Sequence, residues 1–191
     1  MSKRVYVIHG WGGSPEGGWL SWLKYELGKK GFEAEALAMP DTNEPKIEKW
    51  VPHLEKHVGK PDEETYLVGH SIGCQTILRY LDGLPEESKI GGAVFVAGFF
   101  ELKNLNTEEY EAARPWLAKN IDFKKVKKHT KNFTAIFSDN DHLVPLSSAT
   151  VFEKELEAKV IIMNNKGHFC GEDGSIDLPI VLDEILRMSE K

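Results

Sequence analysis

Short, nearly continuous apolar runs alternate with longer amphipathic stretches along this chain. The runs are rich in Val, Ile, Tyr and Phe. An apolar run without polar alternation is typical of a parallel strand that is buried on both faces of its sheet. The pattern therefore predicts six strands, at residues 4–9, 33–37, 65–68, 93–97, 133–137 and 159–163.

The stretches between these runs predict helices, because their apolar residues recur at steps of three and four. Pro52 falls inside one such pattern, between Trp50 and Leu54, so we expect a break or a kink in that helix. The three clearest stripes are Trp19, Leu23 and Leu27, then Cys74, Ile77, Leu78 and Leu81, and finally Leu178, Val181, Leu182, Ile185 and Leu186.

Six alternations of strand and helix predict an α/β fold, a three-layer α/β/α sandwich around one six-stranded parallel sheet. With right-handed crossovers, the expected strand order is 2-1-3-4-5-6. Residues 98–132 are more than one crossover helix needs, which predicts a small excursion there. A length of 191 residues fits a single domain over residues 1–191.

Composition narrows the class of protein without revealing its chemistry. Hydrophobic residues make up 41% and charged residues 28%, which excludes collagen-like, disordered and disulfide-scaffold proteins. With 24 basic and 30 acidic residues, the formal charge is −6, so nucleic acid is not expected as a partner. Cys74 and Cys170 form neither a disulfide framework nor a metal motif. No apolar run could span a bilayer or act as a signal peptide, so we expect a cytoplasmic protein that does not insert into membranes.

The strongest local signal is Gly69-His70-Ser71-Ile72-Gly73, between the third predicted strand and a helical stripe. This G-x-S-x-G pattern in a strand–turn–helix context indicates a nucleophile elbow, a sharp turn that presents the serine hydroxyl. The two glycines let strand and helix approach closely. The Ile72 amide would then lie at a helix N-terminus, where it can stabilise an oxyanion. The alternative is an ordinary turn in which the serine caps the helix.

Candidates for a base and an acid follow in the order that such hydrolases use. His168 lies in a loop after the last predicted strand, and the other histidines fit a catalytic base less well. Asp141 and Asp139 both follow the fifth strand. We prefer Asp141, because Asp139 can instead cap the turn through its side chain. His168 would then take the proton of Ser71, and Asp141 would orient the imidazole.

A second oxyanion donor is expected from the glycine-rich loop after the first strand. The Trp11 amide is the first choice and the Gly12 amide the second. The same glycines, with Asp41 after the second strand, also resemble the start of a dinucleotide-binding fingerprint. Pro15 occupies the place of the third glycine, however, and no helix follows promptly. We therefore expect no nucleotide, no metal and no other cofactor.

Several motifs together carry a resemblance to a known family. The chain resembles the small serine hydrolases grouped around retinoblastoma-binding protein 9, in the α/β-hydrolase superfamily. The resemblance extends over most of the chain. Its motifs are Gly10-Trp11-Gly12-Gly13, Met39-Pro40-Asp41, Trp50-Val51-Pro52, Gly69-His70-Ser71-Ile72-Gly73, Arg114-Pro115-Trp116, Ser138-Asp139-Asn140-Asp141 and Gly167-His168-Phe169.

This resemblance implies a minimal hydrolase fold without a large cap, and a triad of Ser71, Asp141 and His168. It also implies activity on small carboxylic esters or amides. The alternative is a hydrolase-fold protein that has lost turnover and acts as a binding module. The family's namesake binds retinoblastoma protein through an L-x-C-x-E segment. Neither cysteine of this chain stands in such a segment, so that partner is not expected.

Residues in or beside the loops at the carboxyl ends of the strands are candidates for a substrate pocket. Asp41 and Glu101 could hold a substrate amine, although exposed surface acids are the commoner explanation. Cys170, two residues after His168, is not expected to be catalytic. The candidate pocket residues are Trp11, Phe99, Trp116, Leu143 and Phe169, each of which could equally be packing under the excursion.

Overall fold

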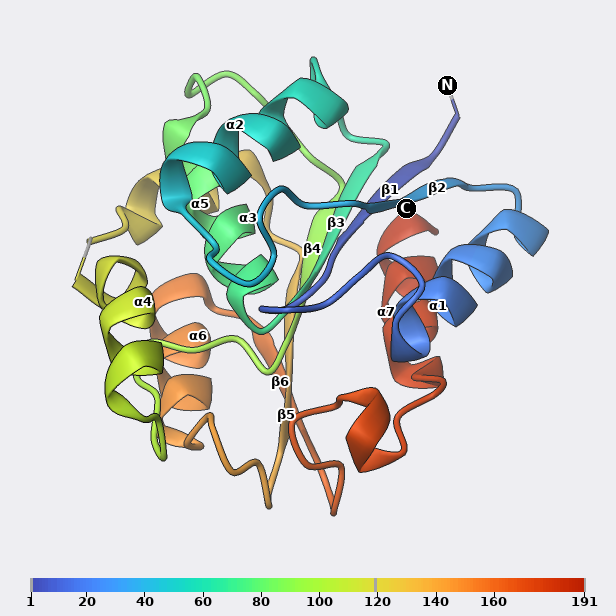
Figure 1. Cartoon of the computed structure of the whole chain (residues 1–191). Helices are drawn as coiled ribbons and strands as arrows, with labels where there is room; N and C mark the ends of the chain where they lie inside the picture. Colours follow the sequence, from blue (N-terminus) through green and yellow to red (C-terminus); the bar gives the residue numbers. More distant parts are fainter. Residues whose placement is uncertain (1, 119, 191) are drawn as a thin grey trace.

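Six parallel strands form one sheet in the computed structural model, which describes residues 2–118 and 120–190 (Figure 1). Their order is β2-β1-β3-β4-β5-β6, so the predicted topology is confirmed. Strand β3 runs two residues further than the apolar pattern indicated, to His70. The strands are β1 (Arg4–Ile8), β2 (Glu33–Leu37), β3 (Thr65–His70), β4 (Gly92–Val96), β5 (Phe133–Ser138) and β6 (Lys159–Met163).

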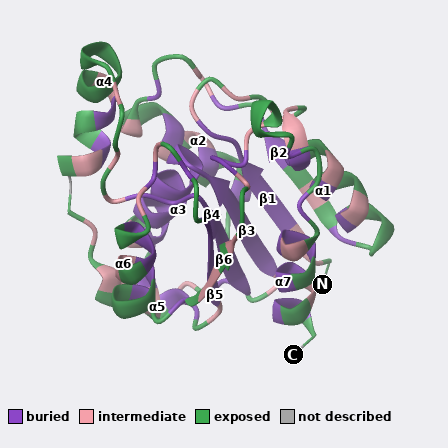
Figure 2. Cartoon of the chain, turned by 90° about the horizontal axis from the view of Figure 1, so that it is seen from below, coloured by how far each residue is buried: buried purple, intermediate pink, exposed green. Residues whose placement is uncertain are grey.

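Helices cover both faces of the sheet and complete the expected three layers (Figure 1). On one face lie α1 (Gly18–Lys29) and α7 (Pro179–Ser189). The other face carries α2 (Ile47–Val58), α3 (Ile72–Gly83), α5 (Phe123–His129) and α6 (Ser147–Leu156). Every residue of β3, β4 and β5 is buried between the two helical layers, which explains their unbroken apolar patterns (Figure 2). No helix in the described ranges is long and apolar enough to cross a membrane.

The excursion expected between the fourth and fifth strands consists of α4 (Thr107–Ala118) and the short helix α5. Helix α4 buries only Ala113 and Trp116, and it lies at the periphery of the molecule (Figure 2). A further short 3₁₀ helix, η1 (Gly171–Asp173), precedes α7. The excursion is therefore one peripheral helix, α4, followed by the short helix α5, and it does not form a cap domain.

Helix α2 continues through Pro52 from Ile47 to Val58, so the expected break does not occur. Proline removes one backbone hydrogen bond from a helix interior. The buried stripe of Trp50, Leu54 and Val58 packs along the whole helix. This packing outweighs the loss of one bond and keeps the helix continuous.

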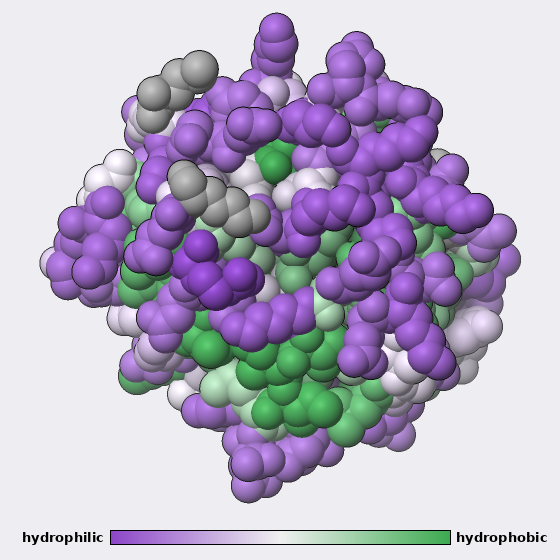
Figure 3. Space-filling view, turned by 180° about the vertical axis from the view of Figure 1, so that it is seen from behind, coloured by the Kyte–Doolittle hydropathy of each residue, from purple (hydrophilic) through white to green (hydrophobic). Residues whose placement is uncertain are grey.

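The two edge strands of the sheet, β6 and β2, expose different kinds of side chain to solvent. Strand β6 carries the sequence Lys-Val-Ile-Ile-Met, and its Ile162 side chain is 51% exposed. Seen from behind, the surface is mostly hydrophilic, with one cluster of hydrophobic side chains below its centre (Figure 3). Strand β2 begins with the exposed Glu33 and has Glu35 exposed at its centre, and such charges protect a sheet edge from pairing.

Candidate active site

Loops that follow four of the strands meet at one edge of the sheet. Since all strands are parallel, their carboxyl ends lie on the same side. Ser71 directly follows β3, Asp141 lies in the loop after β5, and His168 lies in the loop after β6. The loop that carries Trp11 follows β1, the neighbour of β3. The order reverses at this pair of strands, and ligands of open α/β sheets bind at such a switch point.

The turn between β3 and α3 holds Ser71 in an unusual backbone conformation, with φ of 52° and ψ of −117°. The Ser71 amide donates to the carbonyl of Val96 at 2.9 Å. A Cβ atom at Gly69 would lie 2.7 Å from the Cys74 nitrogen, and one at Gly73 would lie 2.4 Å from the Ile8 carbonyl oxygen. Because these neighbours are backbone atoms, both glycines of the motif are sterically required.

Ser71, His168 and Asp141 form a continuous hydrogen-bonded chain. The Ser71 hydroxyl lies 2.9 Å from His168 Nε2, and His168 Nδ1 lies 2.9 Å from Asp141 Oδ2. All three residues are buried. If Nδ1 carries the proton toward the carboxylate, Nε2 is free to accept the hydroxyl proton of Ser71. The geometry therefore suits a serine nucleophile with a histidine base.

Asp141 is held so that one carboxylate oxygen faces the imidazole. Its other oxygen accepts hydrogen bonds from the amides of Leu143 at 2.8 Å and Val144 at 2.9 Å. Burial by itself raises the pKa of Asp141, but the hydrogen bonds from His168 and the two amides outweigh it and lower that pKa below its ordinary value. Asp139 instead accepts the Asn165 amide at 2.8 Å, so its side chain binds the loop that carries His168 and not the local turn that was expected for it.

The glycine-rich loop after β1 brings a second set of amides close to Ser71. A Cβ at Gly10 would lie 3.4 Å from Ser71 Cβ. The Gly12 amide donates to the Thr42 carbonyl at 2.8 Å, so it is already engaged. Within residues 2–118 and 120–190, the amides of Trp11 and Ile72 have no hydrogen-bond partner. Of the two candidates for the second oxyanion donor, the Trp11 amide is therefore free and the Gly12 amide is not.

A pocket of about 600 Å³ opens above Ser71. The predicted residues Trp11, Phe99, Leu143 and Phe169 line it, together with Leu102 and Leu105 from the excursion. Among the described residues, no Lys or Arg lines this pocket, and Glu172 is its one carboxylate. The walls are therefore mostly apolar around Ser71 and His168.

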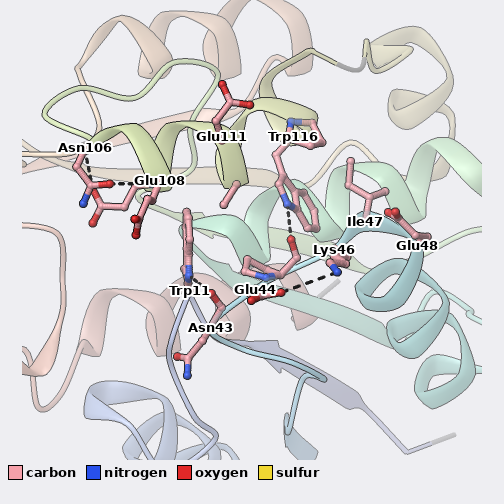
Figure 4. A pocket seen from close by; sticks show the side chains of 14 residues that line it. Trp11, Asn43, Glu44, Lys46, Ile47, Glu48, Asn106, Glu108, Glu111 and Trp116 are labelled. Atoms are coloured by element: carbon pink, nitrogen blue, oxygen red, sulfur yellow. Dashed lines mark hydrogen bonds and ion pairs between the residues drawn. The ribbon is translucent and has the colours of Figure 1, made fainter.

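Trp116, the fifth candidate for this pocket, does not line it. It lines an adjoining hollow of about 690 Å³, together with Trp11 and several glutamates (Figure 4). The indole of Trp116 donates to the Pro45 carbonyl at 3.0 Å and packs edge-on against Trp50, with ring centroids 6.2 Å apart. Trp116 therefore anchors α4 to α2, which is the packing alternative. Of the residues that the structure describes, Trp11 alone borders both cavities.

The two acids considered for a substrate amine also lie outside the pocket over Ser71. Asp41 pairs with Lys49, and Glu101 accepts a hydrogen bond from Ser147. Neither carboxylate lines that pocket. Both are exposed surface acids with local partners, as the commoner explanation held.

The support of the His168 loop was not anticipated from the sequence. We call residues 164–170 the histidine loop. Its backbone is irregular, with positive φ at Asn165, Gly167 and Phe169. The Ser-Asp-Asn-Asp run after β5 was the available signal, since short polar side chains often bind nearby backbone groups. Four successive amides of the loop are held by side chains: Asn165 by Asp139, Lys166 by Ser138, Gly167 by Asn140, and His168 by Asp173, at 2.8 to 2.9 Å.

Comparison with known proteins adds independent observations. The model of a family described as serine hydrolase matches residues 5–187. YdeN of Bacillus subtilis is 34% identical over 191 residues, which cover 100% of this chain and 98% of YdeN. The serine hydrolase RBBP9 of Rattus norvegicus is 26% identical over 173 residues, which are 87% of each chain.

A solved structure agrees with the fold over the full length. The crystal structure of the ydeN gene product from B. subtilis superposes with a TM-score of 0.91, at 32% sequence identity. The match covers 100% of both chains. The whole arrangement of sheet, helices and connecting loops is thus shared with that protein.

Proposed function

The chain belongs to the serine hydrolase family, as its motifs led us to expect, and from that premise we propose that it cleaves small carboxylic esters or amides through an acyl-enzyme on Ser71. One observation carries the proposal: Ser71 Oγ, the imidazole of His168 and Asp141 are joined by two hydrogen bonds of 2.9 Å. Ser71 lies at the switch point of the sheet, and Ser71 and His168 border a pocket large enough for a small ester.

In the first half of the reaction, Ser71 Oγ attacks the carbonyl carbon of the substrate while His168 Nε2 takes the hydroxyl proton. Asp141 keeps the imidazole in the tautomer that this transfer needs and stabilises the imidazolium that forms. The low pKa of Asp141 supports this role, because the carboxylate stays ionised at neutral pH beside its buried partner.

The tetrahedral intermediate carries a negative charge on the former carbonyl oxygen. The free amides of Trp11 and Ile72 are the donors that receive it. Ile72 is the first residue of α3, so its amide also benefits from the positive end of the helix dipole. Gly12 is not a donor in this mechanism, because its amide is bonded to Thr42.

The first half ends when His168 gives the proton to the leaving alcohol or amine, the carbon–oxygen or carbon–nitrogen bond breaks, and the acyl-enzyme remains on Ser71. In the second half, water attacks the acyl carbon while His168 Nε2 takes a proton from it. His168 then returns this proton to Ser71 Oγ as the acyl–oxygen bond to Ser71 breaks and the acid product leaves. The mostly apolar pocket and the carboxylate of Glu172 favour an uncharged substrate over an anionic one.

Labelling with a fluorophosphonate tests the nucleophile. We expect the wild type to be labelled at Ser71 and Ser71→Ala to remain unlabelled, with the loss of esterase activity on a short-chain ester. A label that persists in Ser71→Ala would refute the assignment of Ser71. A folded wild type that neither reacts with the probe nor turns over ester would favour the alternative, a binding module on a hydrolase scaffold.

A further inference from the structure

His70 lies between the glycine and the serine of the elbow, and its imidazole is buried. Its Nε2 lies 2.8 Å from the backbone carbonyl oxygen of His168. A carbonyl oxygen only accepts, so Nε2 must carry the proton and donate it. Burial lowers the pKa of His70 to about 3, which keeps the ring neutral at neutral pH, and the bond to the carbonyl selects the tautomer with the proton on Nε2.

We propose that His70 is a positioning residue: it holds the backbone of His168 so that the imidazole of His168 stays aligned with Ser71. This role rests on the proposed function of the same site. His70 itself does not exchange a proton with Ser71 in this proposal, because its donor nitrogen is occupied by the His168 carbonyl.

The histidine loop needs support on this side. Its amides are held by side chains of the β5–α6 loop and by Asp173, which leaves the carbonyls to be held separately. His70 binds the carbonyl of His168, and the Trp19 indole donates to the next carbonyl, Phe169, at 3.1 Å. Trp19 also packs edge-on against His70, with ring centroids 5.9 Å apart.

The same imidazole contacts the other two parts of the site. His70 precedes Ser71 in the chain, so its backbone belongs to the elbow. A Cβ at Gly10 would lie 3.0 Å from His70 Nδ1, which places the glycine-rich loop directly against the ring. The rings of His70 and His168 are 5.1 Å apart between centroids. One side chain therefore fixes the elbow, the glycine-rich loop and the histidine loop relative to one another.

Loss of this bond should act on kcat more than on KM. His168 Nε2 must stay in line between Ser71 Oγ and the leaving group, and a displacement of about 1 Å costs on the order of 10²-fold in rate. The substrate pocket keeps its other walls, so ground-state binding changes little.

Two substitutions separate the hydrogen bond from the space that the ring fills. His70→Leu keeps an apolar side chain and removes the donor, whereas His70→Gln places an amide N–H at nearly the reach of Nε2. We expect His70→Leu to lower kcat about 10- to 100-fold with KM within about threefold. His70→Gln should retain kcat within about fivefold. If His70→Leu does not fold, His70→Asn takes its place, because its shorter amide cannot reach the carbonyl.

A remote histidine provides the matched control. His129 is also buried, and its Nδ1 bonds the Ser88 carbonyl at 2.9 Å, but α5 places it at the amino-terminal end of the sheet. His129→Leu should lower the melting temperature and leave kcat unchanged. If His70→Leu behaves like His129→Leu, or if His70→Leu and His70→Gln lose kcat equally, the positioning role is overturned.

Proton NMR distinguishes this proposal from the proposed function. The proton that His168 Nδ1 shares with Asp141 should give a sharp downfield resonance in the wild type and in His70→Gln, and a broadened one in His70→Leu. An unreactive wild type with this pattern would contradict the proposed function alone. A reactive wild type whose resonance is equally sharp in all three proteins would overturn the positioning role alone.

Discussion

The elbow and the histidine loop both hold one reacting side chain in place, but they do so by different means. In the elbow, backbone packs on backbone: Gly69 and Gly73 leave no room for a Cβ atom, and Ser71 bonds Val96 through its amide. In the histidine loop the close neighbour of the glycine is a side chain: a Cβ at Gly167 would lie 2.2 Å from Asp173 Oδ1. Side chains from other segments form separate hydrogen bonds with its individual amides and with the His168 carbonyl.

This difference determines how each region should respond to change. A steric constraint acts as a whole, so a single added methyl group should disturb the elbow severely. A set of separate hydrogen bonds gives way in steps, so each lost bond in the histidine loop should cost a limited amount. The side chain of His168 is the exception, because in the proposed mechanism it acts on the reacting atoms.

The largest expected effect comes from the acid that contacts the imidazole. Asp141→Asn should lower kcat by about 10³- to 10⁴-fold, because the amide no longer stabilises the imidazolium and favours the wrong tautomer. Asp139→Asn keeps an oxygen for the Asn165 amide and should lower kcat only a few-fold. Steady-state kinetics on a short-chain ester measure both variants. A greater loss in Asp139→Asn would show that Asp139 is the acid.

Gly73→Ala tests the packing of the elbow. Its Cβ would lie 2.4 Å from the Ile8 carbonyl oxygen, so strand β1 and helix α3 must separate. We expect a loss of about 3 kcal/mol in the free energy of unfolding, measured by denaturant titration. Gly28→Ala is the matched control, because a Cβ there meets nothing within 4 Å in helix α1. It should be neutral or stabilising by up to about 1 kcal/mol. Equal stabilities for the two variants would contradict the steric argument.

Asp173→Ala tests the stepwise support of the histidine loop. It removes the acceptor of the His168 amide at 2.8 Å and of the Cys170 amide at 3.1 Å. We expect kcat to fall about 10-fold while the free energy of unfolding falls by only about 1 kcal/mol. Asp177→Ala, at an exposed neighbouring position, should change neither quantity. A cooperative loss of folding in Asp173→Ala would mean that the loop is held as rigidly as the elbow.

The smallest expected effect is the alkylation of two cysteines. Cys74 directly follows the elbow, and Cys170 ends the histidine loop. Burial and the carboxylates of Asp173 and Glu172 raise the pKa of Cys170 to about 11, and burial raises the pKa of Cys74 further. Iodoacetamide should therefore label neither thiol appreciably at pH 7. Labelling followed by mass spectrometry should detect Cys170 first as pH rises, and Cys74 only in denatured protein. Early reaction of Cys74 would show that the elbow opens more readily than the histidine loop.

The elbow could be predicted from the sequence because its constraint is local. Two glycines around a serine, between an apolar run and a helical stripe, specify the turn. The alternation of such runs and stripes along the whole chain likewise indicated the parallel sheet. The histidine loop could not be predicted in this way, since its supports come from residues up to 98 positions away, as in the bond from His70 to His168. Trp116 was misplaced for the same reason. Its indole partner, Pro45, is 71 positions away.

The positive φ of Ser71 lowers the stability of the fold at the position that the proposed reaction requires to be a serine. A non-glycine residue in this region of backbone space carries a strain of about 1–2 kcal/mol, which glycine does not. Ser71→Gly should therefore raise the melting temperature and abolish the esterase activity. In a lineage that no longer needed the reaction, drift toward glycine would be favoured at this residue. Under the proposed function, the strain at Ser71 therefore serves the reaction and not the stability of the fold.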